Sequence, residues 1–213
     1  MNKVAQFSVP HDEGDPLFVC DATQQLASLF CPETEQLDRS LTVLSAEAES
    51  AAKSGDDFFD RFGFDWQEGY QMTLIAADIN LAMARMAASH FAQQCTLPCT
   101  AYDPVEYSAG AYREVNIDHR VIFIDTPNYN KSRSRYIRRE EKYLRDYIDH
   151  CYSISTDSPS SKANTLYLSA PREALLTPVV IAAALQSMIN RLAAVTPQWV
   201  GKGVFQDFPV LGK

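Results

Sequence analysis

The sequence lacks the features that define several specialised classes of protein. It has only five cysteines in 213 residues. Without a secretory signal, an odd cysteine count does not predict a disulfide framework. The longest apolar run, Pro178 to Leu185, is too short to cross a bilayer. The start of the chain, Met1 to Phe7, has no apolar stretch or cleavage site of a signal peptide. We therefore expect a cytoplasmic protein.

Complete catalytic motifs are also absent from the sequence. No G-x-x-x-x-G-K-[ST] loop occurs, so a P-loop enzyme is not expected. No G-x-S-x-G element occurs, and the four histidines do not complete a nucleophilic motif. The sequence therefore does not establish an enzyme, and it favours a non-enzymatic role.

Charge is unevenly distributed along a chain of otherwise globular composition. Hydrophobic residues make up 46% and charged residues 22%, which does not suggest disorder. The net charge of -8 and the pI near 5.0 argue against a protein coated by nucleic acid or lying on an anionic membrane. Residues 1–130 carry a net charge of -13, whereas residues 131–146 carry +4. The basic block is therefore local.

The pattern of apolar residues predicts an α+β fold. We expect a single domain with a small mixed sheet of four or five strands, covered on one face by four or five helices. Two helices are central to this prediction: a long buried helix over about 65–93, with Asp65 as its N-cap, and an apolar helix over about 178–195. Further predicted elements are strands at 3–9, 17–21, 112–117, 120–125 and 165–170, and helices at 22–30, 32–53 and about 132–152.

A subdivision of the chain is the alternative to a single domain. Residues 1–95 would form an acidic, mainly helical part, and residues 110–213 an α/β part that contains the basic helix. The boundary would then lie near 95–110.

The segment from His119 to Asp146 combines an apolar strand, a polar loop and a basic helix. Residues Val121 to Pro127 are similar to the strand–Asp element of P-loop nucleotide hydrolases, but the phosphate-binding loop of that family is missing. Asp125 is the candidate metal ligand or catalytic base. Lys131, Arg133 and Arg135 are candidate phosphate ligands, because guanidinium groups offer paired donors to oxyanions. A strand-end aspartate beside a solvated helix is the alternative interpretation.

Two other groups of residues are candidate sites. His90, Cys95 and Cys99 are weak candidates for a zinc site, although their spacing matches no established pattern and buried thiols are the alternative. No cofactor is predicted. The acidic residues of the first half, for which an ordinary solvated surface is the alternative, could form a surface for a basic partner; the candidates are Glu47, Glu49, Asp56, Asp57 and Asp60.

Three functional hypotheses follow. The first is a cytoplasmic regulatory or inhibitory protein that binds another protein or complex through its acidic surface and a basic face formed by Lys131, Arg133, Arg135, Arg138, Arg139, Lys142 and Arg145. The second is an enzyme acting on a phosphate-bearing substrate with Asp125 and the Lys131, Arg133 and Arg135 cluster. The third is a nucleic-acid binder that uses the basic helix 131–146. Association with a membrane is not expected, and the chain could form homo-oligomers.

Overall fold

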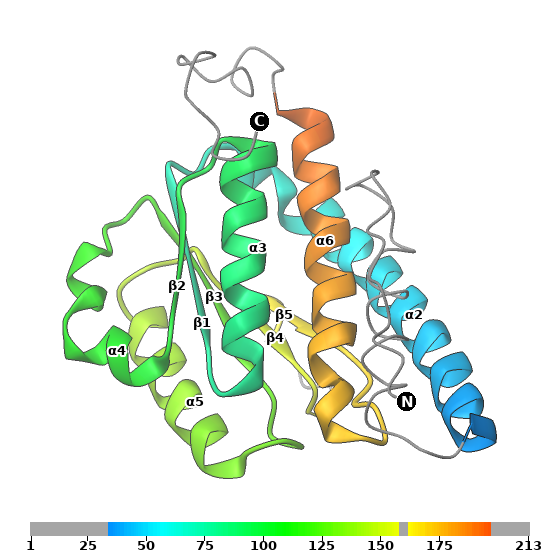
Figure 1. The fold of residues 1–213 in the computed structure, drawn as a ribbon. Coiled ribbons are helices and arrows are strands. Elements are labelled where there is room, and N and C mark those ends of the chain that lie inside the picture. The colour runs from blue at the N-terminus through cyan, green and yellow to red at the C-terminus, as the bar shows by residue number, and fades with distance from the viewer. Residues whose placement is uncertain (1–33, 158–161, 197–213) are drawn as a thin grey trace, which may run out of the picture. The chain divides into compact units, whose positions relative to one another are not determined.

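The computed structural model describes residues 34–157 and 162–196, with side chains from residue 42 onward. The chain forms two compact units, Met1–Ala46 and Glu47–Lys213. The described part of the first unit is helical, and it is the beginning of α2 (Thr34–Gln67). The sheet and the helices that cover it belong to the second unit (Figure 1).

A five-stranded parallel sheet forms the centre of the second unit. Its strand order is β2-β1-β3-β4-β5. The strands are β1 (Gln71–Ala76), β2 (Cys99–Tyr102), β3 (His119–Asp125), β4 (Cys151–Ser155) and β5 (Thr165–Tyr167). The helices between and after them are α3 (Ile79–Cys95), α4 (Pro104–Ala109), α5 (Lys131–Arg145) and α6 (Thr177–Val195), with 3-10 turns at Ala111–Glu114 and Ala174–Leu176.

Helices cover both faces of the sheet, so its central strands are buried throughout. All seven residues of β3 are buried, as expected for the middle of a parallel sheet. The side chains of Ile75, Phe123 and Cys151 pack with Ile137 and Leu144 of α5 on one face. On the other face, α3 and α6 lie side by side (Figure 1).

An aromatic cluster joins the end of α2 to the α3 and α6 face. The indole ring of Trp66 lies 6.4 Å from the ring of Phe91 and 5.7 Å from that of Tyr152. Gly55 allows a close approach nearby, because a Cβ atom there would lie 2.6 Å from the main-chain oxygen of Ala184 in α6. The end predicted for the helix over 32–53 is therefore wrong: the helix continues to Gln67, and Gly55 makes room for α6.

The main features of the predicted fold are confirmed. The protein combines a five-stranded sheet with packed helices, and the apolar helix over 178–195 is α6. The basic helix is α5, the strand over 120–125 is β3, and the strand over 165–170 is β5. The sheet is entirely parallel instead of mixed, and the helices cover two faces instead of one.

The long helix predicted over 65–93 is wrong. Helix α2 ends at Gln67, β1 follows, and α3 begins only at Ile79. Residues Met72 to Ala76 are apolar without interruption because β1 is buried on both faces, and such a run does not distinguish a strand from a buried helix. Asp65 is accordingly in the last turn of α2 instead of being an N-cap.

Other boundaries also differ from the prediction. Residues 111–114 form a 3-10 turn where a strand was predicted over 112–117. Strands β2 and β4 were missed, the second because the helix was predicted to continue to 152. The predicted strands at 3–9 and 17–21 and the helix at 22–30 lie outside the described residues.

Helix α6 also has the length and composition of a membrane-spanning segment. Residues Ala174–Val195 meet that criterion among the described residues. Nine side chains of α6 are buried within the fold, and the helix packs on α3. Its apolar character is therefore explained by its place in the core.

Candidate functional site

The carboxyl ends of β1 and β3 form the topological switch point of this sheet. From β1 the chain passes into α3 on one face, and from β3 it passes into α5 on the other. The two strands are neighbours, so their connections diverge at these strand ends. Open parallel α/β sheets bind their ligands at this place.

Three helices begin at this edge of the sheet. Asn80 in the first turn of α3 donates from Nδ2 to Oγ1 of Thr126 at 2.8 Å. Asn128 donates from Nδ2 to Oγ1 of Thr177, the first residue of α6, at 3.1 Å. Helix α5 begins directly after this loop, at Lys131. The positive ends of three helix dipoles therefore meet near the loop that follows β3.

Buried hydroxyl and amide groups line this loop. The hydroxyl of Thr156, after β4, donates to Oδ1 of Asn128 at 2.5 Å. Asn80 and Thr177 are fully buried, and Thr126 and Thr156 are each 8% exposed. Helices α3 and α6 have no side-chain cap and no acidic residue in their first turns. At this edge these groups thus hydrogen-bond to one another beside two helix ends that lack side-chain caps.

Asp78 occupies the turn between β1 and α3 in a strained conformation. Its φ of 55° lies in the region that favours glycine. Asn130 donates from Nδ2 to Oδ2 of Asp78 at 2.9 Å, and its own Oδ1 accepts from the main-chain N–H groups of Ser132 and Arg133. Asn130 therefore caps α5 and holds Asp78 at the same time.

Arg133 lies between two carboxylates beside the switch point. Its guanidinium is 3.9 Å from Oδ1 of Asp78 and 3.6 Å from Oδ1 of Asp103. Both distances exceed hydrogen-bonding range, and 37% of the side chain is exposed. This guanidinium is therefore loosely held and can turn toward an incoming anion.

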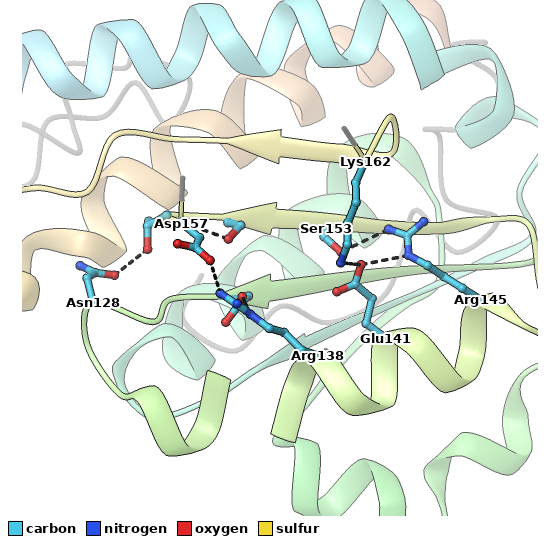
Figure 2. Close-up of polar contacts among 10 residues, drawn as sticks. Asn128, Arg138, Glu141, Arg145, Ser153, Asp157 and Lys162 are labelled. Atoms are coloured by element: carbon cyan, nitrogen blue, oxygen red, sulfur yellow. Dashed lines mark hydrogen bonds and ion pairs between the residues drawn. The ribbon is translucent and has the colours of Figure 1, made fainter. Parts of the chain in front are cut away.

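Asp125 at the end of β3 is engaged by α5. Arg138 donates from Nε to Oδ2 of Asp125 at 2.6 Å and from Nη2 to Oδ2 of Asp157 at 2.7 Å (Figure 2). Burial raises the pKa of Asp125, while the Ser134 hydroxyl and Arg138 oppose the rise. The structure thus pairs Asp125 with Arg138, and no ion pair among the described residues joins Asp125 to Lys131, Arg133 or Arg135.

A second polar cluster lies further along α5. Glu141 is 3% exposed and accepts hydrogen bonds from Arg145 at 2.9 Å and Lys162 at 3.4 Å (Figure 2). Arg145 also reaches Oγ of Ser153 on β4 at 3.5 Å. This cluster joins α5 to β4 and to the segment before β5.

The predicted basic face is divided among different surroundings. Arg133, Arg138 and Arg145 form ion pairs with acidic residues of this chain. Arg139 lies over the ring of Tyr136 at 4.9 Å. The other three residues are exposed: Lys131, Arg135 and Lys142.

The predicted acidic surface is also partly used within the fold. Asp56 accepts a hydrogen bond from Ser187 at 2.6 Å, and Asp60 pairs with Arg191. These contacts fasten α2 to α6. Glu49 and Asp57 are exposed, and Glu47 is partly buried.

The weak zinc candidates are held in other contacts. Nδ1 of His90 lies 2.7 Å from Oε1 of Gln186, and Cys95 donates to the main-chain oxygen of Ile189 at 3.6 Å. Burial raises the pKa values of Cys95 and Cys99 to about 12, which disfavours the thiolates that bind zinc. Among the described side chains, residues 42–157 and 162–196, no three His, Cys, Asp or Glu residues form a group that could hold a metal ion.

The polar residues of the switch point were missed by sequence reasoning. Each follows a strand end or begins a helix: Asn80, Thr126, Asn128, Thr156 and Thr177. The available signal was the polar loop after β3, from Thr126 to Asn130. This signal can be interpreted only when β1 and α3 are known to be separate elements. The sequence prediction instead placed Asn80 in the middle of one long helix.

Comparison with known proteins gives similarity of fold alone. No family model matches the sequence, and no curated protein matches it. A structure from Clostridium difficile 630, provisionally assigned as a phosphosugar isomerase, has a TM-score of 0.69 at 12% identity, covering 81% of this chain and 48% of that one. The chain thus spans about half the length of that protein.

Two further structures show the same similarity. The Escherichia coli CFT073 protein c3406, in complex with A5P, has a TM-score of 0.58 at 13% identity, over 79% of this chain and 97% of that one. Tagatose-6-phosphate ketose/aldose isomerase from Escherichia coli has a TM-score of 0.54 at 14% identity, over 78% and 45%.

These comparisons overturn the leading functional hypothesis. The fold neighbours include proteins named as phosphosugar or sugar-phosphate isomerases, so the predicted non-enzymatic regulator acting through acidic and basic surfaces is wrong. The protein-binding and nucleic-acid-binding assignments have no support from these structures. The division of the basic residues among ion pairs within the chain explains why charge in the sequence was misleading.

Proposed function

We propose that this chain is a sugar-phosphate-binding α/β domain, with its site at the carboxyl ends of β1 and β3. The observation that carries the proposal is the convergence of the first turns of α3, α5 and α6 on one polar loop, Thr126 to Asn130. Helix N-termini attract phosphate through their main-chain N–H groups and their dipoles.

The side chains at the switch point suit both the phosphate group and the sugar hydroxyls of such a ligand. Arg133 offers paired donors to phosphate oxygens, and leaving Asp78 and Asp103 requires it to break only long ion pairs. Asparagine and threonine side chains such as Asn128 and Thr156 both donate and accept hydrogen bonds, as sugar hydroxyls require. The fold neighbours include an isomerase named for tagatose 6-phosphate and a protein solved in complex with A5P.

The proposal concerns binding, and catalysis stays a prediction. Asp125 was the candidate base, but only 5% of its side chain is exposed and Arg138 occupies one carboxylate oxygen. An isomerase role would need a group that exchanges protons with the sugar. An assay for interconversion of aldose and ketose phosphates would test that role separately.

Calorimetric titration with A5P and tagatose 6-phosphate tests the proposal. Arg133→Gln should weaken binding about 10- to 100-fold, because a charge-assisted hydrogen bond contributes about 1.5–3 kcal/mol. Arg135→Gln is the matched control: it removes the same charge from the same helix at an exposed position, and it should leave binding nearly unchanged.

Two results would refute this proposal. One is the absence of binding for both sugar phosphates to the folded wild-type chain. The other is an equal loss of affinity in the Arg133 and Arg135 variants, which would mean that only general charge matters. Unphosphorylated tagatose should bind much more weakly than its phosphate.

The remaining expectations from the sequence stay predictions. They are a cytoplasmic location, a protein partner, self-association and the absence of membrane binding. None of them is needed for the proposed binding site.

A further inference from the structure

Three tyrosines form an exposed aromatic patch at the second half of α5 and the 3-10 turn Ala111–Glu114. Tyr112, Tyr143 and Tyr147 are 41%, 57% and 66% exposed. The ring centroids of Tyr143 and Tyr147 lie 5.0 Å apart. Tyr147 raises the pKa of Tyr143 most, and Tyr112 adds to the rise, so the three residues lie close to one another.

The patch lies on the side of α5 that faces away from the sheet. On the inner side, Ile137, Glu141 and Leu144 are buried, and Glu141 points toward β4 (Figure 2). Helices α4 and α5 cover one face of the sheet, and α3 and α6 cover the other (Figure 1). The tyrosines of the patch therefore take no part in the core between α5 and the sheet.

The composition of this surface is that of an interface between proteins. Tyrosine combines a large apolar face with a polar tip, and tyrosine and arginine are both enriched where proteins bind one another. The guanidinium of Arg113 lies over the ring of Tyr112 at 5.9 Å, and that of Arg139 lies over the ring of Tyr136 at 4.9 Å. The patch is therefore an aromatic surface with arginines beside it.

Charges of opposite sign lie on the two sides of Tyr143. Arg139 precedes it by four residues and Asp146 follows it by three, so all three share one side of the helix. Arg135 continues the same line by one more turn toward the start of α5. Arg135, Arg139 and Asp146 are exposed. Lys142 is adjacent to Tyr143 in sequence and thus points about 100° away around the helix. The line through Tyr143 is therefore positive before the tyrosine and negative after it.

A second copy of the chain is complementary to this line of charge. A two-fold axis near Tyr143 makes the two α5 helices antiparallel, so that Arg139 of each copy lies opposite Asp146 of the other. Such an interface is isologous, and each charge pair forms twice. The exposed rings of Tyr143 and Tyr147 then meet their own copies at the centre. A partner of one charge sign would instead meet a like charge at one end of the line.

We propose that the patch of Tyr112, Tyr143 and Tyr147 is the interface of a homodimer in which Arg139 pairs with Asp146 across the two-fold axis. Helix α5 has 15 residues and is about 22 Å long. A contact between two such helices is smaller than a standard interface, so the dimer should dissociate at about 10 µM. The patch lies toward the end of α5, whereas the proposed sugar-phosphate site lies at its start. Dimer formation is therefore independent of ligand binding.

Sedimentation velocity tests this proposal, with wild type expected to pass from monomer to dimer between about 1 and about 200 µM. Tyr143→Ser removes the central ring, and Asp146→Arg places like charges opposite each other twice. Each should weaken the dimer about tenfold or more. Combining Arg139→Glu with Asp146→Arg exchanges the two charges and should restore association. Lys131→Glu reverses a charge in the first turn of the same helix, away from the patch, and should have no effect.

Three results would overturn the inference: a monomer throughout this concentration range, a dimer unaffected by Tyr143→Ser and Asp146→Arg, or a double variant that associates no better than Asp146→Arg alone. A monomer in which Tyr143 resists nitration by tetranitromethane would also overturn it, because a segment outside the described residues would then cover the patch. Circular dichroism establishes that each variant is folded. Tagatose 6-phosphate affinity should be unchanged in Tyr143→Ser, so failure of the dimer is distinguishable from failure of the proposed function.

Discussion

Asp65 shows how a single residue can serve a role different from the one that its sequence context suggests. It accepts from Nη2 of Arg120 at 2.8 Å, lies 2.8 Å from Nδ1 of His150 and accepts from the hydroxyl of Tyr152. Arg120 is only 4% exposed, so this pair neutralises a buried charge. The network joins the end of α2 to β3 and β4, and local sequence gave no sign of it.

Glu140 should make stability depend on pH. Burial between α4 and α5 raises its pKa to about 7, although the nearby Ser108 hydroxyl and Arg139 lower it and Asp103 adds a small rise. A carboxyl group with a raised pKa binds more protons in the folded than in the unfolded state. Its contribution is therefore fully present below pH 4.5, the unfolded pKa, and is lost as the pH rises to about 7.

Urea unfolding of wild type and Glu140→Gln tests this dependence. From about pH 5 to about pH 8, the free energy of unfolding of wild type should fall by about 1–2 kcal/mol relative to the variant. This is less than the full pKa shift would give, because Glu140 is partly exposed. Parallel pH profiles for the two proteins would show that Glu140 is not responsible.

At the scale of elements, patterning in the sequence predicted the amphipathic helix α5 and misjudged β1, whose apolar run resembles a buried helix. Helix α5 was recognised because Ile137 and Leu144 are separated by charged residues. Strand β1 was assigned to a helix because all of Met72 to Ala76 is apolar. The switch point can be recognised only when β1 is identified as a strand, so its polar residues could not be grouped from the sequence. Arg133, in contrast, was identified by its charge alone.

Helix α5 offers an element-scale test through its N-cap. Asn130→Ala removes the acceptor for the main-chain N–H groups of Ser132 and Arg133 and should lower the free energy of unfolding by about 1 kcal/mol. Asn130→Ser keeps a capping oxygen but loses the amide that contacts Asp78, so its stability should stay near that of wild type. Chemical denaturation measures both, and equal stability of all three proteins would exclude the capping role.

At the scale of the whole molecule, strand order determines where a ligand can meet several helix ends. The order β2-β1-β3-β4-β5 places the loops after β1 and β3 together, although about 50 residues separate them in the chain. Charge segregation along the sequence suggested two opposed binding surfaces instead. In the folded chain several of those charges form ion pairs within the chain instead, as Asp60 with Arg191 and Asp125 with Arg138 illustrate.

Hydrogen–deuterium exchange with tagatose 6-phosphate tests the proposed site most directly. Bound ligand should slow exchange in residues 77–81 and 126–133, which form the turn into α3 and the loop into α5. Tagatose without phosphate should give little protection at the same concentration. Protection confined to other segments, or none at a concentration that saturates binding, would contradict a sugar-phosphate site at the ends of β1 and β3.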